Sequence, residues 1–455
     1  MNYQEIIDKQ QQFFNTNATK DISFRIKELK RLKNILKKNE ASLYNAIYKD
    51  FKKSEFETYV TELSIIYHEI DLALVKVNKW AKKKKASTGL ANLPGKSYII
   101  PEPFGTVLVI GAWNYPYQLS LCPAIAAIAA GCTVVLKPSE VPSRTAAIMA
   151  TLINQNFDPN FFKVIEGGVK ETTELLNVKF DKIFFTGSVP VGKIIYQAAA
   201  KHLTPVTLEL GGKSPAIITK DVNIDMTAKR LVWAKFLNAG QTCIAPDYVL
   251  VESSIKDKLL SSIKEHIEKS DYNVENHNYT QIINEKNFDR LNDMIDRDKV
   301  CIGGNVNKEE RIIPPTVMKD VEFSDDVMQD EIFGPILPVL TFDTIEEAIK
   351  QVKNLSKPLS CYVFTKNNNV KKKVLNEISF GGGAINDAMM HFTEQTLPFG
   401  GVGNSGIGSY HGKYGFETFS HYKSVLQKPF WIEPNFKYSP YSDKKLNFLK
   451  RFIGL

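Results

Sequence analysis

The sequence predicts an α/β fold in which two domains, each built on a mostly parallel sheet, follow one another along the chain. The first observation is the length of 455 residues, which exceeds what one hydrophobic core usually holds. The second is that short, wholly apolar segments alternate with segments of helix length, a pattern typical of parallel strands covered on both faces. A fold of this kind is expected to bind small molecules between its two domains.

Residues 1 to about 80 are expected to form helices, because Ile26, Leu29, Leu32 and Leu36 recur near the helical period among basic residues. From residue 104 the pattern changes to apolar strands separated by helix-length segments. The first strands are expected at 106–110, 133–136 and 183–185. A second series begins after residue 211 and is expected at 216–218, 248–251, 336–340 and 361–364. Each series is expected to build one of the two sheets.

The composition is that of an ordinary globular protein, with 43% hydrophobic and 24% charged residues. The five cysteines are spread along the chain without a C-x-x-C pair, which argues against a disulfide framework and gives no reason to expect a metal site. The N-terminus carries no secretory signal pattern. The longest apolar run, 121–136, contains Pro123 and Gly131 and falls short of the roughly 20 residues that a membrane span needs. A protein of the reducing cytoplasm is therefore expected.

The net charge of +8 raises the question of an acidic partner. Many of the basic residues lie in the helical N-terminal region, which ends in four lysines at 82–85, and in the last dozen residues. Such a run of lysines is typical of a solvated surface segment, and no aromatic residues are interleaved with it as they are in a nucleic-acid groove. Nucleic acid is therefore not expected as a partner.

Three segments carry residues suited to chemistry on a carbonyl group. Asn114 follows the first strand and is able to stabilise an oxyanion through its amide; a plain turn before a proline is the alternative. Glu209 lies between two leucines, and apolar surroundings raise a carboxyl pKa toward that of a general base; a solvent-facing strand residue is the alternative. Cys243 follows a Gly-Gln-Thr turn, where an accessible thiol is suited to nucleophilic attack. The other four cysteines are expected to be small buried apolar residues.

Two further segments suggest a dinucleotide site. Lys137 and Glu140 follow the second strand and are able to bind ribose hydroxyls, although ordinary surface residues at a turn would look the same. Gly187, Ser188 and Gly192 lie where the third strand turns into a helix, so that the backbone can approach a pyrophosphate at the helix N-terminus. Because the spacing differs from G-x-G-x-x-G, this segment alone is only suggestive.

Taken together, these segments resemble the aldehyde dehydrogenase superfamily from about residue 10 to 425. The most specific pieces are Leu-Glu-Leu-Gly-Gly-Lys at 208–213, Gly-Gln-Thr-Cys at 240–243 and Glu-Ile-Phe-Gly-Pro at 331–335. The C-terminal stretch 398–421 is similar to the class 3 branch, which includes enzymes for fatty and aromatic aldehydes.

The resemblance implies NAD(P)-dependent oxidation of an apolar aldehyde to its carboxylic acid. It implies Cys243 as the nucleophile, Glu209 as the base that activates water, and Asn114 with the backbone N–H of Cys243 as the oxyanion hole. The implied cofactor contacts are Lys137 and Glu140 at the adenosine ribose, Gly187, Ser188 and Gly192 at the pyrophosphate, and Glu331 and Phe333 at the nicotinamide ribose and ring. Glu140 favours NAD because a carboxylate repels the 2′-phosphate of NADP, but NADP stays an alternative since class 3 relatives often use both.

The resemblance also implies a division of the chain and a homodimer. Residues 1–81 and 104–210 are expected to form a Rossmann-type cofactor domain, and 211–394 a catalytic α/β domain. Residues 82–103 and 395–430 are expected to form a small oligomerisation segment, and 431–455 a basic amphipathic tail. The substrate tunnel is expected to be shaped by side chains between the motifs, with Trp113, Tyr115, Trp233 and Phe392 as candidates.

In the tail, Leu446, Leu449, Phe452 and Ile453 fall near one face of a short helix that also carries four basic residues. Such a helix is able to lie on the inner face of a membrane, which would favour long, isoprenoid or other lipid-like aldehydes. Docking on the protein itself, or over the substrate mouth, is the alternative. For the whole chain, two other functions stay open: a CoA-acylating aldehyde dehydrogenase, and a non-enzymatic protein that binds a cofactor or a membrane surface.

Overall fold

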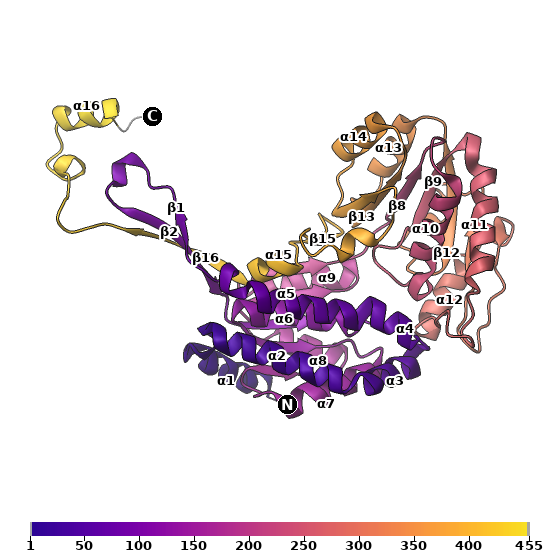
Figure 1. Cartoon of the computed structure of the whole chain (residues 1–455), viewed down its shortest axis with the longest axis horizontal. Helices are drawn as coiled ribbons and strands as arrows, with labels where there is room; N and C mark the ends of the chain where they lie inside the picture. The colour runs from indigo at the N-terminus through magenta and orange to yellow at the C-terminus, as the bar shows by residue number, and fades with distance from the viewer. Residues whose placement is uncertain (1, 453–455) are drawn as a thin grey trace.

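The structure of the chain, a computed structural model, describes residues 2–452 and contains three sheets (Figure 1). The six-stranded sheet has the order β15-β7-β6-β3-β4-β5, and the seven-stranded sheet has the order β10-β11-β12-β9-β8-β13-β14. A separate three-stranded sheet has the order β1-β2-β16. The predicted α/β class with two large sheets is confirmed.

The N-terminal region is helical, as expected. It comprises α1 (Tyr3–Asn15), η1 (Ala18–Lys20), α2 (Ile22–Lys38), α3 (Glu40–Phe51), α4 (Glu55–Thr58), the π-helical turn η2 (Tyr59–Leu63) and α5 (Ser64–Trp80). Helices α2 and α5 pack against α6 (Gln118–Ala130), whose Ala-rich sequence is buried on every side and lies directly on the sheet. The long apolar run of the sequence is therefore this buried helix and the strand that follows it.

The six-stranded sheet consists of β3 (Thr106–Ile110), β4 (Thr133–Lys137), β5 (Phe162–Val164), β6 (Lys182–Thr186), β7 (Val206–Glu209) and β15 (Gly406–Ile407). Its pairs are parallel except β15 with β7. The connections include α7 (Ser143–Asn156), α8 (Val169–Leu176) and α9 (Val189–Ala200). The chain runs outward from β3 through β4 to β5 and then returns to β6 on the other side of β3, which creates a switch point where such sheets bind ligands.

The seven-stranded sheet consists of β8 (Pro215–Ile218), β9 (Tyr248–Glu252), β10 (Val300–Ile302), β11 (Thr316–Met318), β12 (Ile336–Phe342), β13 (Ser360–Phe364) and β14 (Gly382–Ile385). Its helices are α10 (Ile224–Phe236), α11 (Lys256–Ser270), α12 (Glu285–Asp293), α13 (Ile345–Lys353) and α14 (Asn368–Glu377). The short 3-10 turns are η3 (Leu90–Asn92), η4 (Leu237–Gly240), η5 (Ser253–Ile255), η6 (Asp326–Met328), η7 (Met390–Thr393) and η8 (Asn435–Lys437). All four strands expected after residue 211 belong to this sheet.

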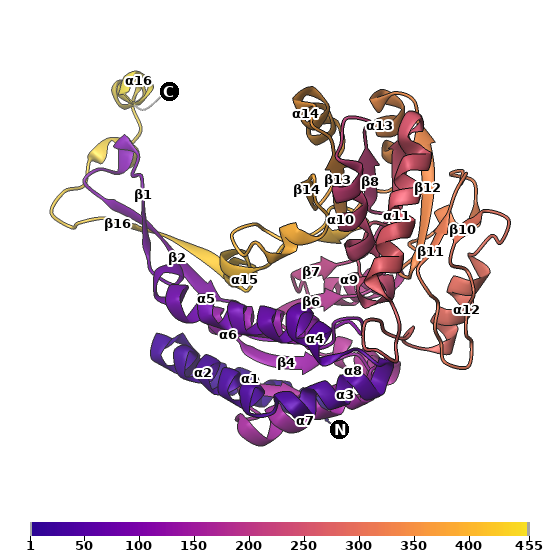
Figure 2. The same cartoon turned by 45° about the vertical axis from the view of Figure 1, so that its right-hand side comes forward.

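An arm projects from the two domains and is built by β1 (Lys84–Ala86), β2 (Lys96–Pro103) and β16 (Ser420–Gln427) (Figures 1 and 2). Strands β2 and β16 pair antiparallel from Pro103 with Ser420 to Lys96 with Gln427. The segment 395–430 divides between two places. Its β15 extends the six-stranded sheet and its α15 (Gly412–Thr418) packs on α5 and α6, while only β16 joins the arm.

The tail forms the expected helix, α16 (Asp443–Phe452), but both views place it at the tip of the arm (Figures 1 and 2). There it packs on η8, and the rings of Phe436 and Phe448 lie 5.6 Å apart. Of the two alternatives for the tail, contact with its own chain is present at η8, whereas a position over the substrate mouth is not, because the arm carries α16 away from the two large sheets. Ile453, one of the four residues assigned to the apolar face, lies outside the described residues. Within residues 2–452, no helix has both the length and the apolarity to cross a membrane.

Candidate active site

One large cavity, of about 1500 Å³, lies at the carboxyl ends of β3, β4, β6 and β7 and extends to the second domain. Every predicted site residue except Gly192 lines it. These residues are Asn114, Lys137, Glu140, Gly187, Ser188, Glu209, Cys243, Glu331 and Phe333. Segments that are far apart in the sequence therefore meet at the edge of the sheet where the strand order predicts a ligand site.

The turn that carries Cys243 has a strained backbone. Asn238, Ala239 and Gly240 all adopt left-handed conformations, with φ angles of 54°, 50° and 70°. A side chain at Gly240 would place its Cβ 2.3 Å from the carbonyl oxygen of Gly334, so the position requires glycine. Non-glycine residues in this conformation persist only where the surrounding contacts hold them.

Several hydrogen bonds hold this turn. Gln241 is buried and donates from Nε2 to the carbonyl oxygens of Asn238 and Gln281, at 3.1 Å each, while its Oε1 accepts from the N–H of Ile283 at 3.0 Å. Asn238 donates from Nδ2 to the carbonyl of Asn114 at 3.0 Å. The buried side chain of Gln241 in the Gly-Gln-Thr-Cys sequence thus holds the turn through its hydrogen bonds.

Asn114 is buried and donates from Nδ2 to the carbonyl oxygen of Gln241 at 3.0 Å. This bond uses one of the two amide hydrogens of Asn114. It fixes the amide close to the turn that carries Cys243. The second amide hydrogen is the kind of donor that stabilises an oxyanion.

The half-buried thiol of Cys243 is protonated at neutral pH in these surroundings. Burial raises its pKa, and the carboxyl groups of Glu331 and Glu209 raise it further, against a smaller lowering by the backbone N–H groups of Cys243 and Ile244. The thiol therefore reacts only if a base takes its proton.

Glu209 ends β7 and is 3% exposed. Neither of its carboxyl oxygens has a hydrogen-bond partner among the residues that the structure describes. Burial raises the pKa of Glu209 well above its usual value. A carboxyl group without a partner, with a raised pKa and beside a thiol is suited to take and return protons near neutral pH.

Glu331 is held against the segment that follows Glu209. A Cβ on Gly211 would lie 1.8 Å from Glu331 Oε2, so glycine at this position makes room for the carboxyl group. Burial and the neighbouring Asp247 raise the pKa of Glu331 to about 8, although Gly212, Lys213 and Arg290 act in the other direction.

Lys213 and Asp247 tie these two segments together. Their ion pair has an N–O distance of 2.5 Å, and Lys213 also donates to the carbonyl of Asp330 at 2.8 Å. Asp247 accepts the N–H of Ile332 at 2.9 Å. Arg290 donates to the carbonyl of Ile332 at 2.8 Å from the other side. The Leu-Glu-Leu-Gly-Gly-Lys and Glu-Ile-Phe-Gly-Pro sequences therefore form one unit around the cavity.

The cofactor end of the cavity is more open. Lys137 ends β4, is 2% exposed, and donates to Glu140 Oε2 at 3.1 Å and to the carbonyl of Pro138 at 3.0 Å. The side chain of Glu140 is 46% exposed. A buried ammonium beside a carboxylate at a strand end provides both a donor and an acceptor for the hydroxyls of a ribose.

The third predicted cofactor segment divides in two. Gly187 and Ser188 line the cavity where β6 turns into α9, so the N-terminus of this helix opens onto it. This end of a helix attracts phosphate groups. Gly192 lies within α9 instead, where a Cβ would meet Leu210 Cδ2 at 2.8 Å. Glycine at this position allows the close packing of the helix on the strand end; Gly192 does not line the cavity, and the expected pyrophosphate contact at this residue stays a prediction.

Apolar side chains form most of the remaining wall. Trp113, Tyr115, Trp233 and Phe392, the four expected tunnel residues, all line the cavity together with Leu119, Leu237, Met389 and Met390. Phe333 has a left-handed backbone, with φ 49°, and meets Trp113 edge to face at a centroid distance of 5.2 Å. Within the described residues, no cluster of three His, Cys, Asp or Glu side chains is arranged to hold a metal ion.

The sequence pattern that defines the aldehyde dehydrogenase family matches residues 1–425. The chain belongs to the aldehyde dehydrogenase family. Aldehyde dehydrogenases oxidise aldehydes with NAD(P).

Three relatives support the assignment. The chain is 46% identical over 445 residues to 4,4'-diaponeurosporen-aldehyde dehydrogenase of Staphylococcus aureus, covering 97% of each chain. It is 45% identical to the dimeric NADP-preferring aldehyde dehydrogenase of Mus musculus, covering 93% of this chain and 94% of the relative. A solved structure, the substrate-bound state of Staphylococcus aureus AldH, superposes with a TM-score of 0.96 at 44% identity and covers 99% of each chain. The predicted resemblance to the class 3 aldehyde dehydrogenases is confirmed, and the comparisons favour neither of the two alternative functions.

Some residues of the site were not identified from the sequence. Asp247 and Arg290 hold the Glu331 segment. Lys53 and Glu62 form a buried ion pair against the segment that follows Asn114. None of them stands in a recognisable motif. Lys53 and Glu62 come from a helical region rich in Lys and Glu, where charged residues usually face solvent.

Proposed function

We propose that the chain oxidises a long apolar aldehyde through a thioester on Cys243, which water activated by Glu209 then hydrolyses. The observation that carries this proposal is the buried, unpartnered carboxyl group of Glu209 in the same cavity as the Cys243 thiol. Such a base is needed to hydrolyse a thioester and is not needed to pass an acyl group to CoA.

The proton transfers follow from these two groups. Glu209 takes the proton of the Cys243 thiol, and the thiolate forms a C–S bond to the carbonyl carbon. The resulting oxyanion accepts hydrogen bonds from Asn114 Nδ2 and from the backbone N–H of Cys243; each such donor is typically worth roughly 3 to 4 kcal/mol in the transition state. Glu209 then releases the thiol proton to solvent. After loss of hydride from carbon, Glu209 takes a proton from water, the hydroxide attacks the thioester, the C–S bond breaks to give the acid, and Glu209 returns its proton to the departing Cys243 thiolate.

The nicotinamide dinucleotide, when bound, supplies the hydride acceptor. Lys137 and Glu140 would hold its adenosine ribose, Gly187 and Ser188 its pyrophosphate, and Glu331 and Phe333 its nicotinamide end. The open helix end at Ser188 and the paired donor and acceptor at Lys137 fit such a group. The carboxylate of Glu140 favours NAD over NADP, although the mouse relative is named as NADP-preferring.

The substrate class is inferred from the wall of the cavity. Tryptophan, phenylalanine, leucine and methionine side chains favour an extended hydrocarbon, and the Staphylococcus aureus relative is named for 4,4'-diaponeurosporen-aldehyde. We expect kcat/KM to rise from benzaldehyde through hexanal to hexadecanal when reduced cofactor is measured by absorbance. A maximum at benzaldehyde would replace the long-chain proposal with an aromatic one. Acceleration by added CoA would favour the acylating alternative.

The division of the chain into a cofactor domain (1–81 and 104–210), a catalytic domain (211–394) and an oligomerisation segment (82–103 and 395–430) is part of the same proposal, except that β15 and α15 of the last segment lie on the cofactor sheet and its helices. The arm supports a homodimer because Phe430 and Trp431 at its end are highly exposed, and the mouse relative is named as dimeric. Light scattering of the purified chain tests this assembly, and a monomer at micromolar concentration would contradict it.

The tail α16 carries Lys444, Lys445, Lys450 and Arg451 together with exposed Leu446, which suits contact with an anionic membrane surface from the cytoplasmic side. Co-sedimentation with anionic liposomes is expected for the full chain and not for a chain ending at Ser442. Equal sedimentation of both chains would contradict a membrane role for the tail.

A further inference from the structure

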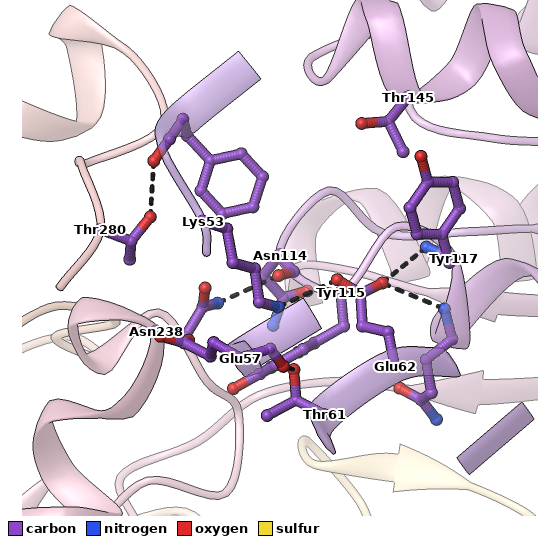
Figure 3. A network of polar contacts seen from close by, with 12 residues as sticks. Lys53, Glu57, Thr61, Glu62, Asn114, Tyr115, Tyr117, Thr145, Asn238 and Thr280 are labelled. Carbon is purple, nitrogen blue, oxygen red and sulfur yellow. Dashed lines mark hydrogen bonds and ion pairs between the residues drawn. The ribbon is translucent and has the colours of Figure 1, made fainter. Parts of the chain in front are cut away.

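A buried ion pair between Lys53 and Glu62 lies close to Asn114, Tyr115 and Asn238 (Figure 3). Lys53, just after α3, and Glu62, in the π-helical turn η2, are both fully buried, and their charged atoms are 2.9 Å apart. A buried pair of this kind is costly to desolvate and adds little to stability compared with apolar residues of the same size. The contacts of the Lys53–Glu62 pair therefore indicate a role other than stabilising the fold.

Glu62 holds the segment that follows Asn114. Its Oε2 accepts the backbone N–H of Tyr117 at 2.8 Å and that of Gln118 at 3.3 Å, where α6 begins. The same carboxylate therefore binds Lys53 through one oxygen and the start of α6 through the other. These hydrogen bonds fix the position of the loop that carries Asn114 and Tyr115.

Lys53 contacts the same loop at Tyr115. Its ammonium lies 4.1 Å from the ring centroid of Tyr115, a cation–π contact that is strong when desolvated. The hydroxyl of Tyr115 is 2.6 Å from Thr242 Oγ1, and Thr242 immediately precedes Cys243. A continuous series of contacts thus runs from Lys53 through Tyr115 and Thr242 to the Cys243 turn.

A segment of the second domain is attached close to the Lys53–Glu62 pair. Thr280 donates from Oγ1 to the carbonyl of Phe51 at 2.5 Å, which joins the end of α3 to the catalytic domain (Figure 3). Asn238 binds the carbonyl of Asn114, as described above. The Lys53–Glu62 pair therefore lies where the two domains meet and where the strained turn has to be held.

We propose that Lys53 is a positioning residue for the Cys243 turn, acting through Tyr115 and Thr242, with Glu62 as its anchor. This inference rests on the proposed role of Cys243 as nucleophile. It assigns a function in catalysis to two residues that touch neither the cavity nor its ligands.

The test replaces both charges together, because removing one would leave the other buried and unpaired. In Lys53→Met/Glu62→Gln the glutamine oxygen still accepts the N–H of Tyr117. We expect kcat to fall about 10- to 100-fold, and the rate of Cys243 alkylation by iodoacetamide to fall by a similar factor, because the nucleophile is displaced. The KM for aldehyde and the Kd for NAD should change less than about twofold, since the walls of the cavity are intact.

Lys49→Met, an exposed lysine on α3, is the matched control and should behave as the wild type. Alkylation is followed on the Cys243 peptide by mass spectrometry, because Cys301 also reacts. Cys301 is exposed, so the expectation that it is buried is wrong, whereas the other three cysteines outside the site are buried as expected. A folded double variant with wild-type kcat and alkylation rate would overturn the proposal. So would a loss confined to the melting temperature, which is what a purely structural pair predicts.

Tyr115→Phe provides a second test that does not disturb the buried pair. It removes only the hydroxyl that binds Thr242, and it should slow the alkylation of Cys243 without changing the Kd for NAD. An unchanged alkylation rate would overturn the proposal even if the double variant did not fold. Cys243→Ala distinguishes failure of the nucleophile assignment from failure of the positioning role of Lys53. If this variant kept its activity, the nucleophile assignment would fail; if it were inactive while Tyr115→Phe and the double variant were normal, only the present inference would fail.

Discussion

The two ends of the cavity are built in different ways. At the catalytic end, Cys243 and Glu209 are set by contacts between segments far apart in the sequence, and the two oxygens of Glu209 have no partner among the described residues. At the cofactor end, Lys137, Glu140 and Ser188 lie in local strand-to-helix turns, and the Glu140 side chain is 46% exposed. Buried groups alter the chemistry through large pKa shifts, whereas solvent screens the exposed ones. Substitutions should therefore abolish activity at the first end and adjust specificity at the second.

The largest effect is expected from Cys243→Ala. Without the thiol no thioester forms, and kcat should fall by at least about 10⁴-fold. Steady-state formation of reduced cofactor measures this loss, and Cys301→Ala is the control because that thiol is exposed and outside the cavity. Normal turnover by a folded Cys243→Ala protein would contradict the assigned chemistry at this end.

Glu209→Gln should reduce kcat by about 10²- to 10⁴-fold, because the amide cannot take a proton from the thiol or from water. In the wild type, kcat should rise with pH as the raised pKa of Glu209 is passed, and the variant should lose this rise. Pre-steady-state mass spectrometry with a mass shift on Cys243 would show whether the acyl-enzyme accumulates. An unaltered pH profile would show that another group is the base.

Glu209→Gln should lower kcat but raise the stability of the fold at alkaline pH. A carboxyl group whose pKa is raised by folding binds a proton in the native state that the unfolded chain has already lost above about pH 4.3. Stability therefore declines as pH rises from that value toward the native pKa. Glu209→Gln removes this dependence, so its melting temperature should exceed that of the wild type at pH 8 and match it more closely at pH 4.

Asn114→Ala should lower kcat by about 10²- to 10³-fold through loss of one oxyanion donor. The KM for aldehyde should change much less, since the oxyanion exists only after attack on the carbonyl. Because Asn114 also holds Gln241, circular dichroism and the Kd for NAD should be compared with the wild type. A pure rise in KM would show that the amide binds the ground state instead.

The smallest effect is expected at the open end. Glu140→Gln removes a carboxylate that repels the 2′-phosphate of NADP, so the ratio of kcat/KM for NADP to that for NAD should rise by roughly tenfold or less, given the exposure of this side chain. The effect should shrink with added salt. Glu174→Gln, an exposed residue on α8, is the control. No change in the ratio would place cofactor choice elsewhere.

The sequence predicted the residues of the site better than the contacts that hold them. Cys243 and Glu209 stand in short motifs whose residue types suit carbonyl chemistry, and Glu331 stands in a motif that resembles the family, so their positions could be found without the fold. Lys53 and Glu62 were missed because their burial depends on contacts with residues 115–118. Such contacts between distant segments cannot be predicted from a local sequence pattern. For Gly192, a glycine near a helix start is compatible with a ligand contact and with close packing, and the packing against Leu210 is visible only in the structure.

The fold class followed from the buried strands, since parallel strands covered on both faces have few other sequence patterns. The tail shows where such reasoning stops. The period of its leucines predicts α16, but the position of that helix depends on the arm, whose strands β2 and β16 lie far apart in the sequence.

The pairing of β2 with β16 also bears on how the protein is made. Strand β2 ends at Pro103 and its partner begins at Ser420, while the cofactor sheet gains its edge strand β15 only at Gly406. During synthesis, the first sheet and the arm therefore stay incomplete until nearly the whole chain has left the ribosome. Unpaired strand edges at that stage are prone to aggregation. Chaperones should accordingly matter more for nascent chains of this protein than for the finished enzyme, and a chain truncated before β16 should accumulate in insoluble form.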